Sequence, residues 1–423
     1  MKKFIASFVL VISSLCFTHF GSQLCHAEEA ESRRGKAGAN SVFNVMDFGA
    51  RGSSPAVDTK AFLAAWGAAC KVNGGVVLVP SGHTFTILPV EFVGSNCQPN
   101  VAFQVDGSLS SPSRSDWGPR STDYWICFNG SAKGLSIRGA GSVDGKGRTW
   151  WPASPSDDVN QELMQGNRPH VILVVYSNNV TISGITVTNS PRMHIFIYGC
   201  HQVEVSNVKV SSPGNSPNTD GIHVSNTQHV RIHHSNISCG DDCVSIQTGC
   251  DDIRVYNVHC NPGHGYSIGG LGERGSAAEV SNVFVTDSTV MGADSLNGVR
   301  IKTWQGGSGY VRNVTFSNIQ VSQVGRAIVI DQYYREETGA VKTENSAVGI
   351  SGVTYENITG TYRSASIVLD CSGDNQGCRD ITIRGVISLR PTDPGAIVKP
   401  HCSNAHGHVL ARNPTPPLAG CLW

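Results

Sequence analysis

Short runs of alternating apolar and polar residues recur through most of the chain. Each run begins with Val or Ile, has a second apolar or aromatic residue two positions later, and lies close to turn residues such as Asn, Ser, Asp or Gly. This alternation is typical of strands that bury one face. The clearest runs begin at Val180, Val203, Val230, Ile253, Val283, Val314, Val353 and Ile381. The pattern predicts many short strands joined by tight turns.

The runs follow one another at intervals of 23 to 39 residues. Intervals of this size indicate a repeat architecture, in which one unit is too small to bury its own apolar face. Stacking the units as successive coils gives them a continuous core. We therefore predict an all-β fold, a right-handed single-stranded parallel β-helix that forms one domain over residues 28–423.

A helical pattern precedes the repeats, at residues 59–70. Its apolar residues recur at helical spacing, and Asp58 or Thr59 is suited to begin the helix. These apolar residues are Ala61, Phe62, Ala65 and Trp66. Because exposed strand edges at the end of a solenoid invite association, we expect this short helix to cap the amino-terminal end.

The chain begins with features of a secretory signal. Lys2 and Lys3 precede an apolar run at residues 4–17, and small residues follow near Ala27. We predict a signal peptide over residues 1–27, secretion to the extracellular region, and disulfides among the remaining cysteines. No later stretch reaches the ~20 apolar residues that a membrane-spanning helix needs, so we expect no membrane association of the mature form.

Composition narrows the class of ligand. The chain has 32 basic and 32 acidic residues, so it offers no overall positive field for nucleic acid, which we exclude as the main partner. The sequence also contains five sequons, which are either glycan acceptors or asparagines that favour tight turns. They begin at Asn129, Asn179, Asn236, Asn313 and Asn357.

Four polar clusters stand in order within the repeats. Asp220, Asp242 and His264 lie 22 residues apart, so stacked coils should align them in a column. Alternation across Ile301 should direct Arg300 and Lys302 to one face of a strand. The clusters are Asn218-Thr219-Asp220, Gly240-Asp241-Asp242-Cys243, Gly263-His264-Gly265 and Arg300-Ile301-Lys302.

Neighbouring carboxylates with nearby cations favour acid/base chemistry. Like charges raise the pKa of at least one carboxyl group, while cations lower the pKa of others. The resulting proton donor and base are what hydrolysis of a glycosidic bond requires. Arg300 and Lys302 would bind a negatively charged sugar. Gly240 would let the chain bend so that Asp241 and Asp242 both reach a cleft.

With Asn44-Val45-Met46-Asp47-Phe48-Gly49-Ala50, the four clusters resemble the plant polygalacturonases of glycoside hydrolase family 28 over nearly the whole mature chain. The resemblance implies hydrolysis of α-1,4-galacturonosyl linkages in pectin, with inversion, in the plant cell wall. It implies no cofactor and no metal. We expect a monomer, and internal attack in preference to attack at chain ends.

The resemblance also implies individual roles. Asp241 would be the general acid, Asp220 and Asp242 would activate water, and His264 would support protonation of the acid. Substrate would be bound by Arg300, Lys302, Asn218 and Tyr334. The implied disulfides are Cys243–Cys260, Cys371–Cys378 and Cys402–Cys421, with Cys70–Cys97 as a further pair. Many relatives have a cysteine pair in the loop after the tyrosine, where this chain has Arg335-Glu336-Glu337-Thr338-Gly339.

Two other classes of protein remain open at this point. A pectate lyase would share the architecture but use calcium, which prefers six to eight oxygen ligands, and His264 and Lys302 would disfavour such a site. A non-catalytic pectin-binding protein would keep the fold alone. Zinc is disfavoured because Cys243 is better used in a disulfide. We interpret the other histidines, such as His233 and His234, as structural, as we do Cys127, Cys200, Cys239 and Cys250.

Overall fold

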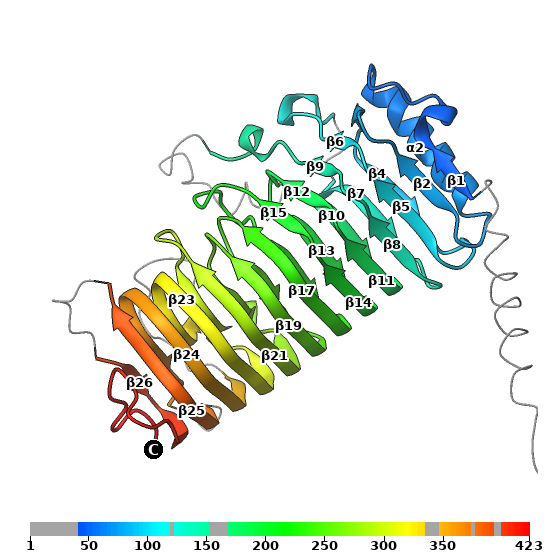
Figure 1. Ribbon diagram of the computed structural model, residues 1–423. Helices are drawn as coiled ribbons and strands as arrows, with labels where there is room; N and C mark the ends of the chain where they lie inside the picture. Colours follow the sequence, from blue (N-terminus) through cyan, green and yellow to red (C-terminus); the bar gives the residue numbers. More distant parts are fainter. Residues whose placement is uncertain (1–40, 119–121, 153–167, 335–346, 374–376, 393–398) are drawn as a thin grey trace, which may run out of the picture. The chain divides into compact units, whose positions relative to one another are not determined.

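The computed structural model describes residues 41–118, 122–152, 168–334, 347–373, 377–392 and 399–423. The predicted signal peptide and the loop that begins at Arg335 lie outside these residues. Val42–Trp423 forms one compact unit. Its strands pair in parallel from coil to coil (Figure 1), which makes it a right-handed parallel β-helix and confirms the predicted fold.

The first coils contain the shorter strands. They are β1 (Val42–Asn44), β2 (Val76–Val79), β3 (Thr84–Thr86), β4 (Val90–Val93), β5 (Val101–Val105), β6 (Ser108–Ser110), β7 (Tyr124–Asn129), β8 (Leu135–Arg138), β9 (Ser142–Asp144), β10 (His170–Val175), β11 (Asn178–Ser183), β12 (Thr186–Thr188), β13 (Ile195–Tyr198), β14 (His201–Ser206) and β15 (Lys209–Ser211). Single turns of 3₁₀-helix lie at η1 (Val45–Phe48), η2 (Arg114–Asp116) and η3 (Gly147–Thr149).

The later strands include the longest ones, up to the 27 residues of β23. They are β16 (Ile222–Ser225), β17 (Gln228–Ser238), β18 (Val244–Ile246), β19 (Cys250–Cys260), β20 (Tyr266–Leu271), β21 (Ala277–Met291), β22 (Asn297–Trp304), β23 (Ser308–Tyr334), β24 (Ala347–Asp370), β25 (Cys378–Pro391), β26 (His401–Ser403) and β27 (Ala405–Val409), with η5 at Glu273–Gly275. Two ladders of hydrogen-bonded strands, each with one strand from every successive coil, are used to describe the site. The first ladder is β7, β10, β13, β16, β18, β20, β22 and β23. The second ladder is β8, β11, β14, β17, β19, β21, β23, β24 and β25.

The repeated apolar positions form the core of the solenoid. Val180 pairs with Val203, and the register continues without a break to Ile381, so all eight predicted run starts lie side by side. None of the eight is more than 2% exposed. The alternation therefore determines which face of each strand is buried.

Asparagines occupy the turns between ladders. Asn313 has a φ of 54°, a left-handed conformation that asparagine tolerates better than most residues. Its Nδ2 donates to Asn282 Oδ1 at 2.6 Å, and Asn357 Nδ2 donates to Asn318 Oδ1 at 3.0 Å. Asn179 also has a positive φ, of 54°. Three of the five sequon asparagines thus have the conformation of turn residues.

The amino-terminal helix, α2 (Pro55–Ala69), begins earlier than predicted. Its N-cap residue is Ser54, because Pro55 has no N–H to satisfy and its fixed φ suits the first turn. Asp58 instead accepts a hydrogen bond from the Arg51 N–H at 2.7 Å. Phe62 is fully buried and lies edge-on to a phenylalanine of β3. The helix therefore packs against the first coils (Figure 1), as a cap would.

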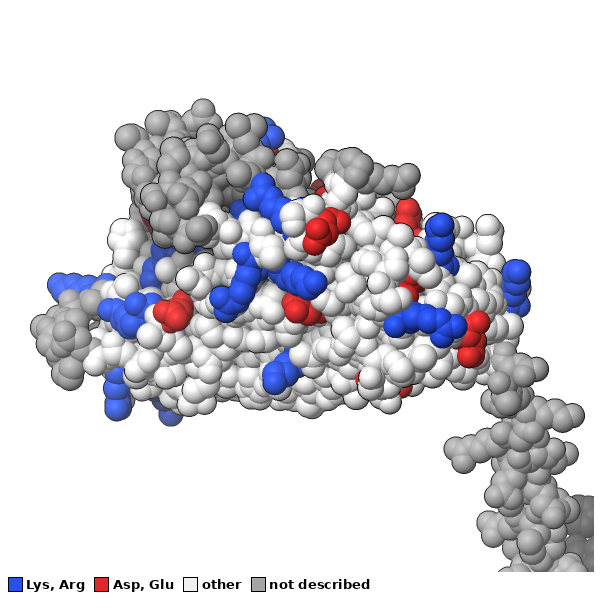
Figure 2. Space-filling model, turned by 90° about the horizontal axis from the view of Figure 1, so that it is seen from above, with Lys and Arg blue, Asp and Glu red and all other residues white. Residues whose placement is uncertain are grey.

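Disulfides join nearby turns of the solenoid. They are Cys70–Cys97, Cys243–Cys260, Cys371–Cys378 and Cys402–Cys421. Cys127, Cys200, Cys239 and Cys250 are buried thiols. Within the described ranges, no helix combines the length and the apolar character needed to span a bilayer. Figure 2 shows one face on which charged side chains are separated by wide uncharged areas, in keeping with a charged fraction of 15%.

Candidate active site

The polar clusters meet beside the first ladder. Ile222 pairs with Val244, and Val244 with Tyr266, so the residues two positions before them align as well. These residues are Asp220, Asp242 and His264, which form the column that their spacing predicts. Asp220, Asp241 and Asp242 line one cleft of about 430 Å³, together with Asn218, Lys302 and Tyr334.

Glycines allow the coils in this column to approach closely. A Cβ on Gly240 would collide with the Ser216 carbonyl oxygen, and one on Gly263 would collide with the Cys243 sulfur. Gly240 does not have a positive φ. The bend at Asp241 therefore needs glycine for lack of space, and not for the conformational freedom expected from the sequence. The Cys243–Cys260 disulfide packs against Gly263 and so supports the position of His264.

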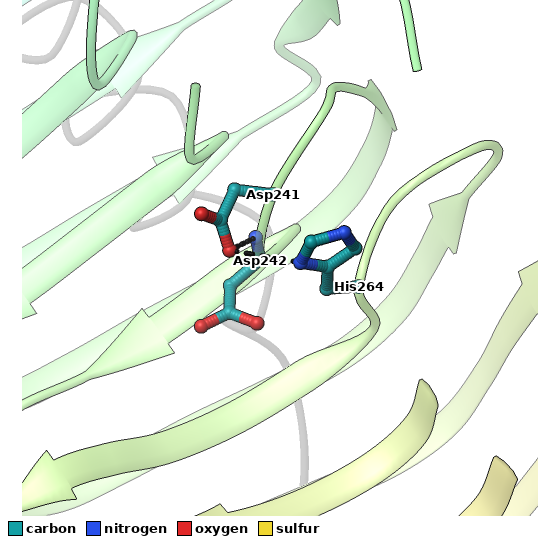
Figure 3. A group of neighbouring side chains, drawn as sticks. All are labelled: Asp241, Asp242 and His264. Carbon is teal, nitrogen blue, oxygen red and sulfur yellow. Dashed lines mark hydrogen bonds and ion pairs between the residues drawn. The ribbon is translucent and has the colours of Figure 1, made fainter. Parts of the chain in front are cut away.

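Asp241 forms a pair with His264. His264 Nδ1 lies 3.0 Å from Asp241 Oδ1, which also accepts the Asp242 N–H at 2.8 Å. Figure 3 shows the imidazole and the Asp241 carboxylate facing each other, while the Asp242 carboxylate points away from this contact. Burial tends to raise the pKa of Asp241, but the hydrogen bond and charge of His264, with Lys302 and Arg300, lower it below its usual value. Burial tends to lower the pKa of His264, yet Asp241 raises it overall.

Asp242 binds both cations. Its Oδ1 accepts hydrogen bonds from Ser267 Oγ at 2.6 Å and Arg300 Nη2 at 2.8 Å, and its Oδ2 accepts one from Lys302 Nζ at 3.1 Å. The Arg300 and Lys302 side chains are 6% and 9% exposed. Ile301, between them, is fully buried in the core, as the alternation predicts. Sequence reasoning placed the two cations near the carboxylates and assigned them to the substrate, but did not predict that both would pair with Asp242.

Asp220 differs from Asp241 in its electrostatics. His223 Nδ1 lies 2.8 Å from Asp220 Oδ2, and both side chains are almost fully buried. Burial and then the charge of Asp241 raise the pKa of Asp220, and His223 offsets only part of this effect. The pKa shifts of Asp220 and Asp241 therefore have opposite directions.

Two residues that contact the carboxylates were not predicted from the sequence. His223, which was interpreted as structural with the other histidines, contacts Asp220; Ser267 contacts Asp242. Strand alternation could have identified His223. It lies between Ile222 and Val224, whose side chains are buried, so its own side chain points to the opposite face of the strand. Tyr334 was predicted, and its ring lies 5.0 Å from Lys302 Nζ and 5.5 Å from the Trp304 ring.

Asp241, Asp242 and His264 are the one group of possible metal ligands found among the described residues, with ligand atoms within 4.8 Å of one another. Both Asp242 oxygens already accept hydrogen bonds from cations. Calcium prefers six to eight oxygen ligands, and two adjacent positive side chains oppose any cation. The donor set does not fit a calcium site.

A parallel β-helix with a cleft lined by three carboxylates is consistent with the class of glycoside hydrolases. Residues 71–407 match the model of glycosyl hydrolases family 28, and the chain belongs to this family. It is 39% identical to Polygalacturonase QRT2 of Arabidopsis thaliana over 86% of this chain and 81% of that protein. It is 37% identical to Polygalacturonase-2 of Solanum lycopersicum over 86% of this chain and 78% of that protein.

Solved structures share the fold. The endo-xylogalacturonan hydrolase from Aspergillus tubingensis superposes with a TM-score of 0.68 at 24% identity, covering 84% of this chain and 98% of that chain. Endopolygalacturonase I from Stereum purpureum, complexed with two galacturonates, gives a TM-score of 0.58 at 20% identity, covering 78% of this chain and 95% of that chain.

Proposed function

We propose that this protein is a secreted polygalacturonase, which hydrolyses α-1,4-galacturonosyl linkages of pectin in the plant cell wall with inversion. The observation that carries the proposal is the cleft itself. Asp220 and Asp241 line it with pKa values shifted in opposite directions, beside the cations Arg300 and Lys302. Opposite shifts in neighbouring carboxyl groups are what division into acid and base requires. The plant relatives named above support the substrate class.

Asp241 would donate a proton to the leaving oxygen, although its pKa is lowered in the free protein. Three of the groups that lower this pKa are His264, Lys302 and Arg300. A galacturonate carboxylate bound beside Lys302 and Arg300 would offset their charges and so raise the pKa of Asp241. His264, which shares the proton with Asp241, could then supply it. Substrate binding would therefore prepare the acid.

Asp220 and Asp242 would activate the attacking water. Asp242 is paired with Arg300 and Lys302, which fix the orientation of its carboxylate. The charge of Asp241 is one of the causes that raise the pKa of Asp220. Once a proton from His264 has neutralised Asp241, this cause is removed, the pKa of Asp220 falls, and Asp220 releases its own proton to solvent. Substrate binding would thus leave Asp241 protonated and Asp220 ionised.

The length of the cleft supports attack within chains. Its lining residues include members of seven strands of the first ladder, β10, β13, β16, β18, β20, β22 and β23, and of the turns beside them. Strands in a ladder lie about 4.8 Å apart, so these seven strands extend over roughly 29 Å. That distance is longer than one sugar, so a polymer could lie along the ladder. We therefore favour internal attack over release of terminal sugars.

Secretion and a monomeric state complete the proposal. Four disulfides are characteristic of an oxidising compartment, which agrees with the signal peptide predicted at residues 1–27. One chain supplies every lining residue of the cleft, so a single copy is sufficient for catalysis.

The purified protein should be incubated with polygalacturonate, with and without a calcium chelator. We expect new reducing ends without ultraviolet absorbance from unsaturated products, unaffected by the chelator. Mixed oligomers at early times would support internal attack, and monomer alone would contradict it. Calcium-dependent absorbance would identify a lyase. Binding without either signal would identify a pectin-binding protein.

A further inference from the structure

The column that contains Asp220 continues toward the amino terminus. Ile172 pairs with Ile195, and Ile195 with Ile222, so His170 holds the position that Asp220 holds two coils later. His170 lines the same cleft but is only 3% exposed. Its Nδ1 is buried and has no hydrogen-bond partner among the described residues. A buried imidazole nitrogen without a partner is costly unless a ligand satisfies it.

Arg192 lies next to this position, in the segment before β13, and also lines the cleft. Its Nε is buried and has no hydrogen-bond partner within the described ranges. No carboxylate of the described residues forms an ion pair with it, whereas Arg300 and Lys302 are both paired with Asp242. Burial, and then the charges of Arg192 and His223, lower the pKa of His170, so its ring is neutral.

An aromatic side chain connects this pair to the carboxylates. The Phe196 ring lies 5.0 Å from the His170 ring and 4.8 Å from the His223 ring, and His223 contacts Asp220. Phe196 is partly exposed and lines the cleft. An aromatic face beside a cation suits a charged sugar, which has both apolar C–H groups and a carboxylate.

We propose that Arg192 and His170 form a second carboxylate-binding position, on the amino-terminal side of Asp220, which selects an unesterified galacturonate there. Arg192 binds the carboxylate through its guanidinium group, His170 Nδ1 bonds to the same carboxylate or an adjacent hydroxyl, and Phe196 supports the ring. A methyl ester removes the charge and leaves Arg192 unpaired. The inference rests on the proposed function for the choice of sugar.

Binding is measured first, so that the result does not depend on turnover. In an Asp241→Asn background, calorimetry with hexagalacturonate compares Arg192→Gln with Arg231→Gln, an exposed arginine of β17 in the second ladder. Loss of one charge-assisted contact should raise Kd about tenfold for Arg192→Gln and leave it unchanged for the control. Arg192→Lys should recover part of the loss because it keeps the charge. A Kd within twofold of the parent, or a lysine variant no better than glutamine, overturns the proposal.

Specificity is measured next, in the catalytically intact protein. The ratio of kcat/KM on polygalacturonate to that on highly methyl-esterified pectin should fall about tenfold in Arg192→Gln, mainly through KM on polygalacturonate. An unchanged ratio overturns the selective role. If the parent protein binds hexagalacturonate but cleaves neither polymer, the proposed function fails, and the calorimetry alone decides the inference. His170→Phe, checked for folding by its thermal transition, should raise Kd by a smaller factor; an unchanged Kd removes His170 from the site.

Discussion

A histidine–aspartate pair lies beside the first ladder of the solenoid and another lies in the second ladder, and the two pairs differ in how deeply they are buried. In the cleft, His223 and Asp220 lie 2.8 Å apart, with side chains 9% and 8% exposed. In the second ladder, His229 and Asp252 lie 2.9 Å apart, but their side chains are 50% and 32% exposed. The first pair lies within one coil, three residues apart, and the second joins neighbouring coils, 23 residues apart, but neither spacing indicates how deeply the pair is buried.

Burial gives the two aspartates opposite pKa shifts. The pKa of Asp252 is lowered, first by the hydrogen bond from His229 and then by Arg254, which together outweigh the opposing effect of burial. The pKa of Asp220 is raised, because burial and the charge of Asp241 outweigh His223. A histidine–aspartate pair on an open face is therefore a solvated, hydrogen-bonded pair. It becomes a candidate acid/base pair only where several carboxylates share a cleft.

The comparison is tested most severely by removing one carboxylate from each ladder. Asp241→Asn should lower kcat on polygalacturonate by about 10³-fold while hexagalacturonate binding persists, since an amide cannot donate the proton. Asp252→Asn should leave kcat within about twofold. Reducing-end assays with both purified variants provide the measurement. Substantial turnover in Asp241→Asn, or a large loss in Asp252→Asn, would contradict the assignment.

The ion pairs of the two ladders should differ in stability. Arg300→Met leaves the buried Asp242 with one cation fewer and should reduce the free energy of unfolding by about 3 kcal/mol. Arg254→Met breaks the exposed pair with Asp252, at 3.1 Å, and should cost about 1 kcal/mol or less. Urea unfolding of both variants measures the difference. Equal losses would show that burial does not separate the two pairs.

A smaller effect concerns pH. The raised pKa of Asp220 means that its contribution to stability is complete below its unfolded value, near 3.8, and is lost as pH rises through its folded value. The asparagine of Asp220→Asn cannot ionise, so the Tm of this variant should rise relative to that of the parent protein as pH rises from about 4 to about 7.

For Asp252→Asn, the change in Tm with pH relative to the parent should have the opposite sign. Because the folded pKa of Asp252 is lowered, its contribution to stability is present above the unfolded value, near 3.8, and is lost as pH falls through the folded value. This variant should therefore lose Tm relative to the parent as pH rises toward about 4, and the difference should stay constant at higher pH. Thermal scans from about pH 2 to about pH 7 measure both slopes. Slopes of the same sign would refute the contrast between the two carboxylates.

Much of the fold was predictable because strand alternation and repeat length are local properties of the sequence. The apolar residues that begin each run define the buried face, and their intervals define the coils. The 22-residue spacing of Asp220, Asp242 and His264 placed the column in advance. The start of α2 was predicted too late, because the helical period identifies the buried face of a helix better than its first residue.

Only the tertiary structure decided which charged side chains of the site pair with one another and which are buried. Pairing of Asp242 with Arg300 and Lys302 spans about sixty residues, and burial of Asp220 depends on the coils on either side of it. The unpartnered nitrogens of His170 and Arg192 are likewise visible only when neighbouring coils are in place. The sequence by itself thus determined the solenoid, its core and the candidate residues. Proton placement and cation pairing depend on desolvation and on contacts between distant coils, which spacing does not specify.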